Sequence, residues 1–352
     1  MTREWTVGVV GYGWVTGAHI TALQLVPGVR VVAVCSSREL DAAELEKRHG
    51  AHIEVLHDLD ELLARPDIDV IDICSRSNLH AAQATAAARA GKHLIVEKPI
   101  ALSLGDLRGL EAAVRDSNVR TCVCFEVRYS PQFTETKRLL DQGMLGELHY
   151  AELDYYDAVG PTFGQYEWNR LKVGGGSSLL SAGCHAVDGL LMFMGTDVTE
   201  VTSYATQSSH PEFERYEYPT TSVTIMRFAN GSVGKVASVL DANQPYYLRV
   251  HLIGSEGTVL DGKVWSRRIE GLDRDTWTSL GVKLESSADV IEHPYLEQFE
   301  AFFAALNEDR EMALTSLADA VPTFEVIFAA DRSAEEGRTV QLDEIHGDRG
   351  DG

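Results

Sequence analysis

The chain has 352 residues, of which 44% are hydrophobic and 24% are charged, so it is long and apolar enough to bury the cores of about two domains. Its formal net charge of −22 argues against a broad basic face of the kind that binds nucleic acid. We find no apolar run long enough to predict a membrane span, and the first residues lead directly into a predicted strand rather than a signal peptide.

The cysteine pattern is typical of a protein from a reducing compartment. Five cysteines lie mostly in apolar runs: Cys35, Cys74, Cys122, Cys124 and Cys184. None forms a CxxC pair, so we predict reduced, buried thiols and a cytoplasmic location. His49, His52 and His57 lack the spacing of metal ligands on one helix or strand, and we predict no metal site.

The first 127 residues alternate short apolar runs with helical patterns. Strands are predicted at residues 7–10, 29–35, 70–74, 93–96 and 121–125, and helices after Gly13 and at 40–49, 59–63, 79–90 and 103–116. Ser103 and Asp106 have the spacing of a helix-capping pair. Regular alternation of strand and helix predicts an α/β domain with a parallel, doubly wound sheet.

From residue 128 onward the predicted strands follow one another. Strands are predicted at 148–156, 198–207, 222–228, 232–240, 247–254, 258–260 and 263–269, and helices at 132–141, 181–194, 294–307 and 317–335. Asn230-Gly231 is a signal for a hairpin turn. We predict an α+β domain over residues 128–342 with a large, mostly antiparallel open sheet, and a disordered tail at 343–352.

A glycine-rich turn follows the first strand. Gly11 suits a tight turn, and Gly13 would let a diphosphate approach the backbone at the start of the next helix, together with Trp14 and Val15. Thr16 stands where the usual fingerprint has its third glycine, so the match is incomplete. The pattern predicts a nucleotide site, and a strand–helix turn without a ligand is the alternative.

The second strand ends in Ser36, Ser37 and Arg38, with no carboxylate at its tip. An acidic residue at this place binds the ribose 2′-hydroxyl of NAD, whereas hydroxyls and an arginine can hold the 2′-phosphate of NADP. We therefore favour NADP over NAD as the cofactor. An Arg38 that is merely solvated is the alternative.

Polar residues also follow the third and fourth strands, at the edge of a parallel sheet where ligands bind. They are Ser75, Ser77 and Asn78 after the third strand, and Glu97 and Lys98 after the fourth. We predict that these residues contact the cofactor, and that Pro99 keeps Lys98 extended. Asn78 could instead cap the helix that follows it.

The chain carries a series of short motifs in a fixed order. They are Gly11-Tyr12-Gly13 with His19 in the following helix, Asn78-Leu79-His80, AGKHLIVEKP at 90–99, Arg128-Tyr129-Ser130-Pro131, GMLG at 143–146, GGGSSLLSAGCHAVD at 174–188 and GSEG at 254–257. In order and spacing they resemble the Gfo/Idh/MocA family, named for glucose–fructose oxidoreductase, inositol dehydrogenase and the rhizopine-catabolism oxidoreductase. The E-K-P and G-G-G…G-x-H elements together are specific, whereas the glycine turn alone is not.

The resemblance implies a Rossmann domain at residues 1–127 and a substrate domain at 128–342, whose open sheet makes the contact of a homodimer or homotetramer. It implies hydride transfer between NAD(P) and a secondary alcohol of a small polyol, namely a sugar, glycoside or cyclitol. It adds His80 to the expected cofactor contacts and places Lys98 and His185 at the reacting carbon. Neither nucleic acid nor a membrane is an expected partner.

These two residues suit that chemistry. Oxidation of a secondary alcohol removes a hydride and a hydroxyl proton, and a neutral histidine is a suitable base while a lysine ammonium stabilises the developing alkoxide. Many family members carry an aspartate four residues before this histidine. Here Ser181 stands there, so a three-member Lys/Asp/His site is not supported. Asp188, one helical turn after His185, is a candidate to orient the ring, with a helix-surface or interdomain contact as the alternative.

Further residues are candidates for substrate contacts. They are Arg128, Tyr156, Tyr166, Trp168, Asn169, Arg170 and Ser181, besides His185. Aromatic faces with hydrogen-bond donors suit a sugar ring, and ordinary packing is the alternative for each aromatic residue. Two other functions stay open: a cofactor-binding regulator without turnover, and a glycoside hydrolase that uses bound NAD for a transient oxidation.

Overall fold

The computed structural model describes residues 3–284, 290 and 293–347. The chain divides into two compact units, one formed by Met1–Glu126 with Pro294–Ala320 and the other by Val127–His293 with Val321–Gly352. The change of sequence pattern near residue 127 coincides with a change of unit. Residues 294–320, which the sequence assigned to the second domain, belong with the first unit instead.

The return of this segment to the first unit has a packing reason. Helix α10 (Tyr295–Asn307) packs on α1 (Thr16–Leu25), and its Phe299 is fully buried. At the end of α10, the indole N–H of Trp5 donates to the Asn307 side-chain oxygen at 2.9 Å. Because α10 covers apolar surface that the N-terminal residues leave, the first unit needs both parts of the chain.

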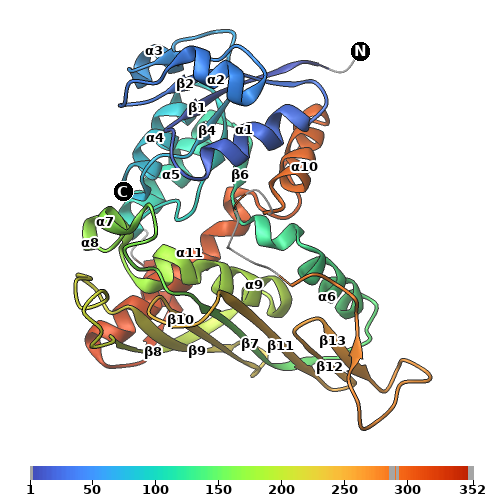
Figure 1. The fold of residues 1–352 in the computed structure, drawn as a ribbon. Helices are drawn as coiled ribbons and strands as arrows, with labels where there is room; N and C mark the ends of the chain where they lie inside the picture. Colours follow the sequence, from blue (N-terminus) through green and yellow to red (C-terminus); the bar gives the residue numbers. More distant parts are fainter. Residues whose placement is uncertain (1–2, 285–289, 291–292, 348–352) are drawn as a thin grey trace. The chain divides into compact units, whose positions relative to one another are not determined.

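The first unit is built on a six-stranded parallel sheet with the order β3-β2-β1-β4-β5-β6. Its strands are β1 (Trp5–Val10), β2 (Val29–Cys35), β3 (Glu54–Leu56), β4 (Val70–Ile73), β5 (His93–Val96) and β6 (Thr121–Val123). The strand order reverses between β1 and β4, which creates a topological switch point at their carboxyl ends (Figure 1). The predicted doubly wound sheet is thus confirmed, while the three-residue β3 was not predicted.

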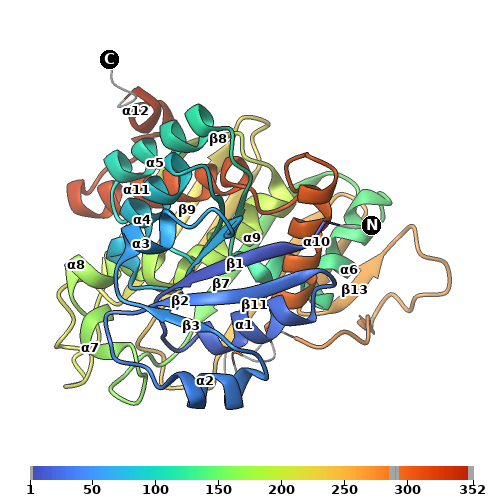
Figure 2. The same ribbon diagram turned by 90° about the horizontal axis from the view of Figure 1, so that it is seen from above.

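Helices cover both faces of this sheet (Figures 1 and 2). The pair α1 and α10 lies on one side, and the pair α4 (Ser77–Arg89) and α5 (Leu104–Ser117) on the other. The shorter helices of this unit are α2 (Ala42–His49) and α3 (Leu59–Leu63). The Ser103 hydroxyl accepts the Asp106 backbone N–H at 3.1 Å, so the predicted cap of α5 is present.

The second unit is built on a nine-stranded sheet with the order β14-β13-β12-β11-β7-β10-β9-β8-β15. Its strands are β7 (Leu148–Tyr156), β8 (Val198–Thr206), β9 (Thr221–Phe228), β10 (Val233–Val239), β11 (Tyr247–Gly254), β12 (Gly257–Leu260), β13 (Lys263–Ser266), β14 (Thr278–Ser279) and β15 (Val340–Gln341). Strands β7 and β10 run parallel, and the other neighbouring pairs in this order are antiparallel. The predicted Asn230-Gly231 turn joins β9 to β10, with Gly231 at φ +85°.

One face of the nine-stranded sheet is covered by helices. Helix α9 (Cys184–Met194) packs on β7 and β10, and a Cβ added at Gly189 would lie 2.7 Å from the Leu153 side chain. Figure 1 shows α9 and α11 (Leu317–Glu336) on this side of the sheet. We call the opposite side the open face, since it carries the exposed side chains Tyr204, Val223 and Ile225.

The other helices of this region are η1 (Glu126–Tyr129), α6 (Pro131–Asp141), α7 (Tyr166–Asn169), α8 (Lys172–Gly175), η2 (Leu179–Gly183) and α12 (Leu342–Gly347). The helix predicted from residue 181 is preceded and joined by η2, a turn of π-helix. The prediction of a disordered tail was wrong for residues 343–347, which form α12. The rest of that tail, residues 348–352, lies outside the described residues.

Two expectations from composition can be compared with the structure. The five cysteines are buried free thiols, as predicted. The helical stretch Lys172–Met194, however, is long and apolar enough to cross a membrane by length and composition, which the sequence analysis had not recognised. Of its most apolar window, 78% is buried inside the protein, which is typical of a core helix.

Candidate active site

The glycine turn between β1 and α1 has the geometry of a phosphate cradle. Gly11 has φ +92°, and a Cβ there would lie 2.8 Å from the Cys74 carbonyl oxygen, so the turn requires glycine. At Gly13 an added Cβ would lie 3.9 Å from its nearest neighbour, which leaves room for a ligand beside the backbone. Thr16, in place of the third glycine, is fully buried, and its hydroxyl accepts the Gly13 N–H at 2.9 Å. Trp14 is 44% exposed beside this turn and Val15 is half-buried.

The end of β2 reaches the same turn. Ser36 is buried, and its hydroxyl accepts the Arg38 backbone N–H at 3.1 Å. Ser37 and Arg38 are exposed. The Arg38 guanidinium donates to the Tyr12 carbonyl oxygen. Arg38, the residue predicted to bind the ribose 2′-phosphate of NADP, therefore lies beside the glycine turn.

The three polar residues after β4 occupy different environments. Ser75 is half-buried, Ser77 is buried as the first residue of α4, and Asn78 is exposed one residue further. The N-cap position of α4 is Arg76, so the suggestion that Asn78 caps the helix was wrong. Asn78 is therefore accessible to a ligand from the first turn of α4.

His80 faces the protein rather than a ligand. It is buried, and its ring nitrogens lie 2.8 Å from the Pro99 carbonyl oxygen and 3.1 Å from the Ser75 carbonyl oxygen. Burial lowers the pKa of His80, although both carbonyl oxygens act in the opposite direction. His80 thus links the loop after β4 to the loop after β5, and its predicted contact with a cofactor stays a prediction.

Glu97 and Lys98 follow β5 directly and differ in their exposure to solvent. Glu97 is 5% exposed, whereas Lys98 is half-buried. The Glu97 carboxylate accepts the Lys98 backbone N–H at 3.0 Å and the Tyr295 hydroxyl at 3.0 Å. The Glu97 carboxylate is thus engaged inside the first unit, and the predicted contact of this residue with a cofactor stays a prediction.

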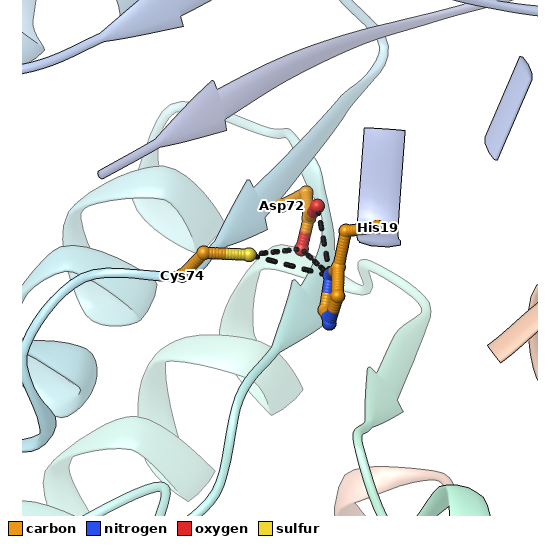
Figure 3. Close-up of side chains that lie close together, drawn as sticks. All are labelled: His19, Asp72 and Cys74. Carbon is orange, nitrogen blue, oxygen red and sulfur yellow. Dashed lines mark hydrogen bonds and ion pairs between the residues drawn. The ribbon is translucent and has the colours of Figure 1, made fainter. Parts of the chain in front are cut away.

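A buried polar cluster lies behind these residues. His19 of α1 faces Asp72 of β4 and Cys74 just beyond it (Figure 3). Its Nδ1 lies 3.1 Å from both carboxylate oxygens of Asp72 and 3.3 Å from the Cys74 sulfur. Both His19 and Asp72 are fully buried. Sequence reasoning noted His19 only as part of a motif and did not predict this cluster.

His185 lies in the first turn of α9 and is 7% exposed. One turn earlier, Ser181 pairs with Asn169, since the amide nitrogen donates to the hydroxyl at 2.8 Å and the hydroxyl donates to the amide oxygen at 3.0 Å. The Tyr218 hydroxyl donates to the Asn169 carbonyl oxygen at 2.7 Å. A neutral hydrogen-bonded pair therefore occupies the place where the family resemblance led us to look for an aspartate.

Arg128 and Asp188, predicted separately as a substrate contact and as a guide for His185, bind each other. Arg128 Nε and one terminal nitrogen lie 2.6 Å from the two Asp188 carboxylate oxygens. The Thr323 hydroxyl donates to the same carboxylate at 3.0 Å. Arg128 and Asp188 are 7% and 2% exposed, so the pair is buried, and the predicted roles of the two residues toward a substrate and toward His185 stay predictions.

The aromatic loop before the glycines is largely structural. Tyr166 is 1% exposed and its hydroxyl donates to the Glu212 carbonyl oxygen at 2.5 Å, so it belongs to the core. Arg170 pairs with Glu167 at 3.1 Å, while Trp168 is half-buried. A Cβ at Gly174 would lie 2.0 Å from the Trp168 carbonyl oxygen, so this glycine lets the loop fold back on itself.

Tyr156, a candidate substrate contact from the sequence, lies on the open face of the nine-stranded sheet. Its hydroxyl donates to Asp154 at 3.2 Å, and its ring stacks on Tyr247 with centroids 6.1 Å apart. These residues share the open face with Lys235, whereas Leu153 and Tyr155 lie on the side of α9. Because side chains alternate along a strand, neighbouring residues lie on opposite faces, and Tyr155 is the residue that shares a face with α9.

Comparisons with known proteins identify the family. Residues 5–125 match the model of an oxidoreductase family with an NAD-binding Rossmann fold, and residues 133–260 match the GFO/IDH/MocA C-terminal domain. Myo-inositol 2-dehydrogenase of Thermotoga maritima is 26% identical over 354 residues, which cover 97% of this chain and 99% of the relative. Levoglucosan dehydrogenase of Pseudarthrobacter phenanthrenivorans is 29% identical over 284 residues, 72% of each chain.

A solved structure shares the fold. Levoglucosan dehydrogenase in complex with NADH and levoglucosan superposes with a TM-score of 0.83 at 24% identity, covering 96% of this chain and 99% of that one. The two family models together span more than half of the chain, in the order that the motifs predicted. The chain therefore belongs to the Gfo/Idh/MocA family of NAD-binding oxidoreductases.

Proposed function

We propose that the protein transfers a hydride between a nicotinamide cofactor and a secondary alcohol or ketone of a sugar, glycoside or cyclitol. The family assignment and the dehydrogenase names of its relatives support this proposal. The observation that carries it is the retention of two ionisable groups, Lys98 at the carboxyl end of β5 and His185 at the start of α9, in a chain with a glycine cradle for the cofactor.

The residues of the glycine turn fit a dinucleotide. A side chain at Gly11 would collide with backbone, and the space beside Gly13 is open, which is what close approach of a diphosphate requires. The bound nicotinamide supplies the acceptor or donor of the hydride. The protein supplies position, charge and a route for the proton.

We assign the proton to His185. In the oxidation, the neutral imidazole takes the hydroxyl proton as the carbon–hydrogen bond breaks, and it returns the proton in the reduction. Lys98 donates a charge-assisted hydrogen bond to the substrate oxygen and stabilises its developing negative charge. Ser181, four residues before His185, is hydrogen-bonded to the neutral Asn169 side chain, so in this proposal no carboxylate raises the basicity of the histidine from position 181.

The assay is the growth of the reduced-nicotinamide absorbance with NADP or NAD and a panel of aldoses, glycosides and inositols. We expect one substrate class to be oxidised. Lys98→Met and His185→Ala should each lower kcat by about a thousandfold or more while the cofactor Kd stays within about twofold. Near-normal turnover by either variant would contradict the roles assigned to them.

The panel also separates the two alternatives. A regulator would bind cofactor by titration and give no absorbance change with any substrate. A redox-neutral hydrolase would release free sugar from a glycoside without net accumulation of reduced cofactor. Either result would replace the proposed function.

For the cofactor we propose a preference for NADP. Ser36, Ser37 and Arg38 hold the place at which a carboxylate would select the ribose 2′-hydroxyl, and Arg38 lies beside the glycine turn. Arg38→Ala should weaken NADP binding by about tenfold and NAD binding by less than about twofold. Equal effects on the two cofactors would remove the reason for this preference.

We also propose that the open face of the nine-stranded sheet joins copies of the chain into a dimer or tetramer. Val223 and Ile225 are 38% and 50% exposed there, next to the 75% exposed Tyr204. Light scattering at micromolar concentration should show an oligomer that Ile225→Asp dissociates. Leu25→Asp, at a 62% exposed leucine in the first unit, is the control that should leave it intact. A wild-type monomer would refute this part of the proposal.

A further inference from the structure

His19 sits between two carboxylates. Its Nδ1 faces Asp72 at 3.1 Å, and its Nε2 lies 3.0 Å from Glu97 Oε1. Both partners are carboxylate groups, so the ring donates to both only when each nitrogen carries a proton, as in the imidazolium ion. The rings of Tyr295 and Phe299 lie against it, with centroids 4.3 and 5.2 Å away.

The surroundings favour that charged form. Burial alone lowers the pKa of His19, but Cys74 and Asp72 outweigh it and raise the pKa well above its ordinary value. The ionisable groups that face His19 from the elements around it are Asp72, Cys74, Glu97, Cys122, Cys124 and Tyr295. Burial raises the pKa of the Cys74 thiol to about 12, so the thiol is uncharged at neutral pH.

His19 in turn controls the charge on Glu97. Burial raises the pKa of the Glu97 carboxyl, but the hydrogen bond and charge of His19, followed by the charge of Lys98, lower it below its ordinary value against the opposing charge of Glu126. The ionised Glu97 accepts the backbone N–H of Lys98 at 3.0 Å and also interacts with its side-chain charge. A connected path of hydrogen bonds therefore runs from α1 through His19 and Glu97 to Lys98.

The path also crosses three elements that converge at the cofactor end of the sheet. His19 lies in the helix that begins directly after the glycine turn, Asp72 in β4, and Glu97 at the end of β5. One cation thus connects the helix that follows the glycine turn to the residues that directly follow β5. The Tyr295 hydroxyl, from the returning segment, donates to the same Glu97 oxygen at 3.0 Å.

We propose that His19, as an imidazolium held between Asp72 and Glu97, is a positioning residue for Lys98. It keeps Glu97 ionised in the interior, and Glu97 fixes the Lys98 backbone and stabilises the ammonium form of its side chain. This inference rests on the proposed role of Lys98, and it assigns His19 and Glu97 no contact with the substrate.

The first test does not depend on turnover. Acylation of Lys98 by acetic anhydride, followed by mass spectrometry across a pH series, reports how much of the amine is uncharged in the cofactor-free protein. Glu97→Gln should move the labelling midpoint of Lys98 to lower pH by about one unit, because the neighbouring anion is gone. Ile20→Val, a fully buried neighbour of His19 on α1, should leave the midpoint unchanged. An unchanged midpoint in Glu97→Gln would overturn the proposal.

The second test observes His19 itself. In nitrogen-15 NMR of histidine-labelled protein, the signals that vanish in His19→Gln should show two protonated ring nitrogens at pH 8. A neutral ring at pH 8 would overturn the proposal. One equivalent of a tightly bound transition metal would also overturn the proposal, because a metal-bound ring is not an imidazolium. Two groups of donor atoms lie within 4.8 Å of one another, namely those of His19, Asp72 and Cys74 and those of His19, Glu97 and Cys124.

The third test uses turnover, once a substrate is known. His19→Gln and Glu97→Gln should each lower kcat by about tenfold to a hundredfold, while the cofactor Kd stays within about twofold of wild type. In Glu97→Gln the alkaline limb of the plot of kcat against pH should move to lower pH. A purely structural role predicts lower thermal stability with an unchanged pH profile, as for Ile20→Val, and that result would refute our assignment. If no substrate is turned over, the proposed function fails, while the labelling and NMR results still decide the role of His19.

Discussion

The two units each bury an ion cluster next to a proposed catalytic residue, and the clusters differ in the nature of their cation. In the first unit His19 joins Asp72 and Glu97, and Glu97 directly precedes Lys98. In the second unit Arg128 binds Asp188, which follows His185 by three residues. A guanidinium keeps its charge at any pH that proteins tolerate, whereas an imidazolium can lose its proton.

We therefore call the Arg128–Asp188 pair the fixed brace and the cluster of His19, Asp72 and Glu97 the adjustable one. The bidentate Arg128–Asp188 pair, with Thr323 on the same carboxylate, holds one charge state throughout. The His19 cluster holds its charge state only while its carboxylates outweigh the burial of the ring. The comparison predicts that above about pH 7 stability depends on pH through His19 and not through Arg128.

The largest effect should come from breaking the fixed brace. Arg128→Met leaves the buried Asp188 carboxylate without its cation, and we expect the free energy of unfolding to fall by about 3–5 kcal/mol. Denaturant unfolding at neutral pH measures it. Arg138→Met is the matched control, since Arg138 is half-exposed and pairs with Glu135 on the same helix, and it should lower stability far less than Arg128→Met. Similar losses in both variants would show that the buried pair carries no special weight.

A smaller effect is expected from His19→Gln, because glutamine keeps one donor for a carboxylate. We expect a loss of about 2 kcal/mol near pH 7. The pKa of His19 is raised in the folded protein, so its contribution is complete below the unfolded pKa of about 6.5 and is lost as the pH rises through the folded pKa.

The decisive measurement is therefore a series of unfolding curves from about pH 7 to about pH 9.5. The difference between wild type and His19→Gln should shrink as the pH rises, since wild type loses stability that the variant no longer has. Arg128→Met should keep the wild-type pH dependence. A difference for His19→Gln that stays constant over this range would mean that His19 is not charged in the folded protein.

The smallest effect should come from removing both partners of the fixed brace. In the double variant Arg128→Met with Asp188→Leu, no buried charge remains, and we expect stability within about 1 kcal/mol of wild type apart from the lost acceptor of Thr323. Unfolding of the single and double variants under one condition measures this recovery. A double variant as unstable as Arg128→Met would mean that packing, rather than the charge, is what the pair supplies.

The sequence was most informative where local chemistry decides structure. The glycine turn, the E-K-P motif at the end of β5 and most strands of both sheets follow from short patterns that act within a few residues. The Gly11 position is a clear case, because only a glycine can approach the Cys74 carbonyl oxygen so closely at a positive φ.

The polar clusters could not be predicted in the same way. His19 and Glu97 are 78 residues apart in sequence, and Arg128 and Asp188 are 60 apart. One signal was available in retrospect: Asp72 interrupts the apolar strand β4, and a buried carboxylate requires a partner. The sequence could not say which residue that partner is. Likewise, the periodicity of β7 could not tell Tyr155 from Tyr156 as the residue on the face of α9.

The two-part composition of the first unit constrains how the protein can be made. A ribosome delivers Met1–Glu126 early, but Tyr295, which bonds to Glu97, emerges only after the whole nine-stranded sheet except its last strand has been synthesised. The nascent N-terminal segment must therefore wait with the surface beneath α10 uncovered, where it is a target for chaperones. A gene fragment cut at residue 127 would produce this unfinished intermediate permanently, so a cofactor-binding fragment has to carry residues 294–320 as well.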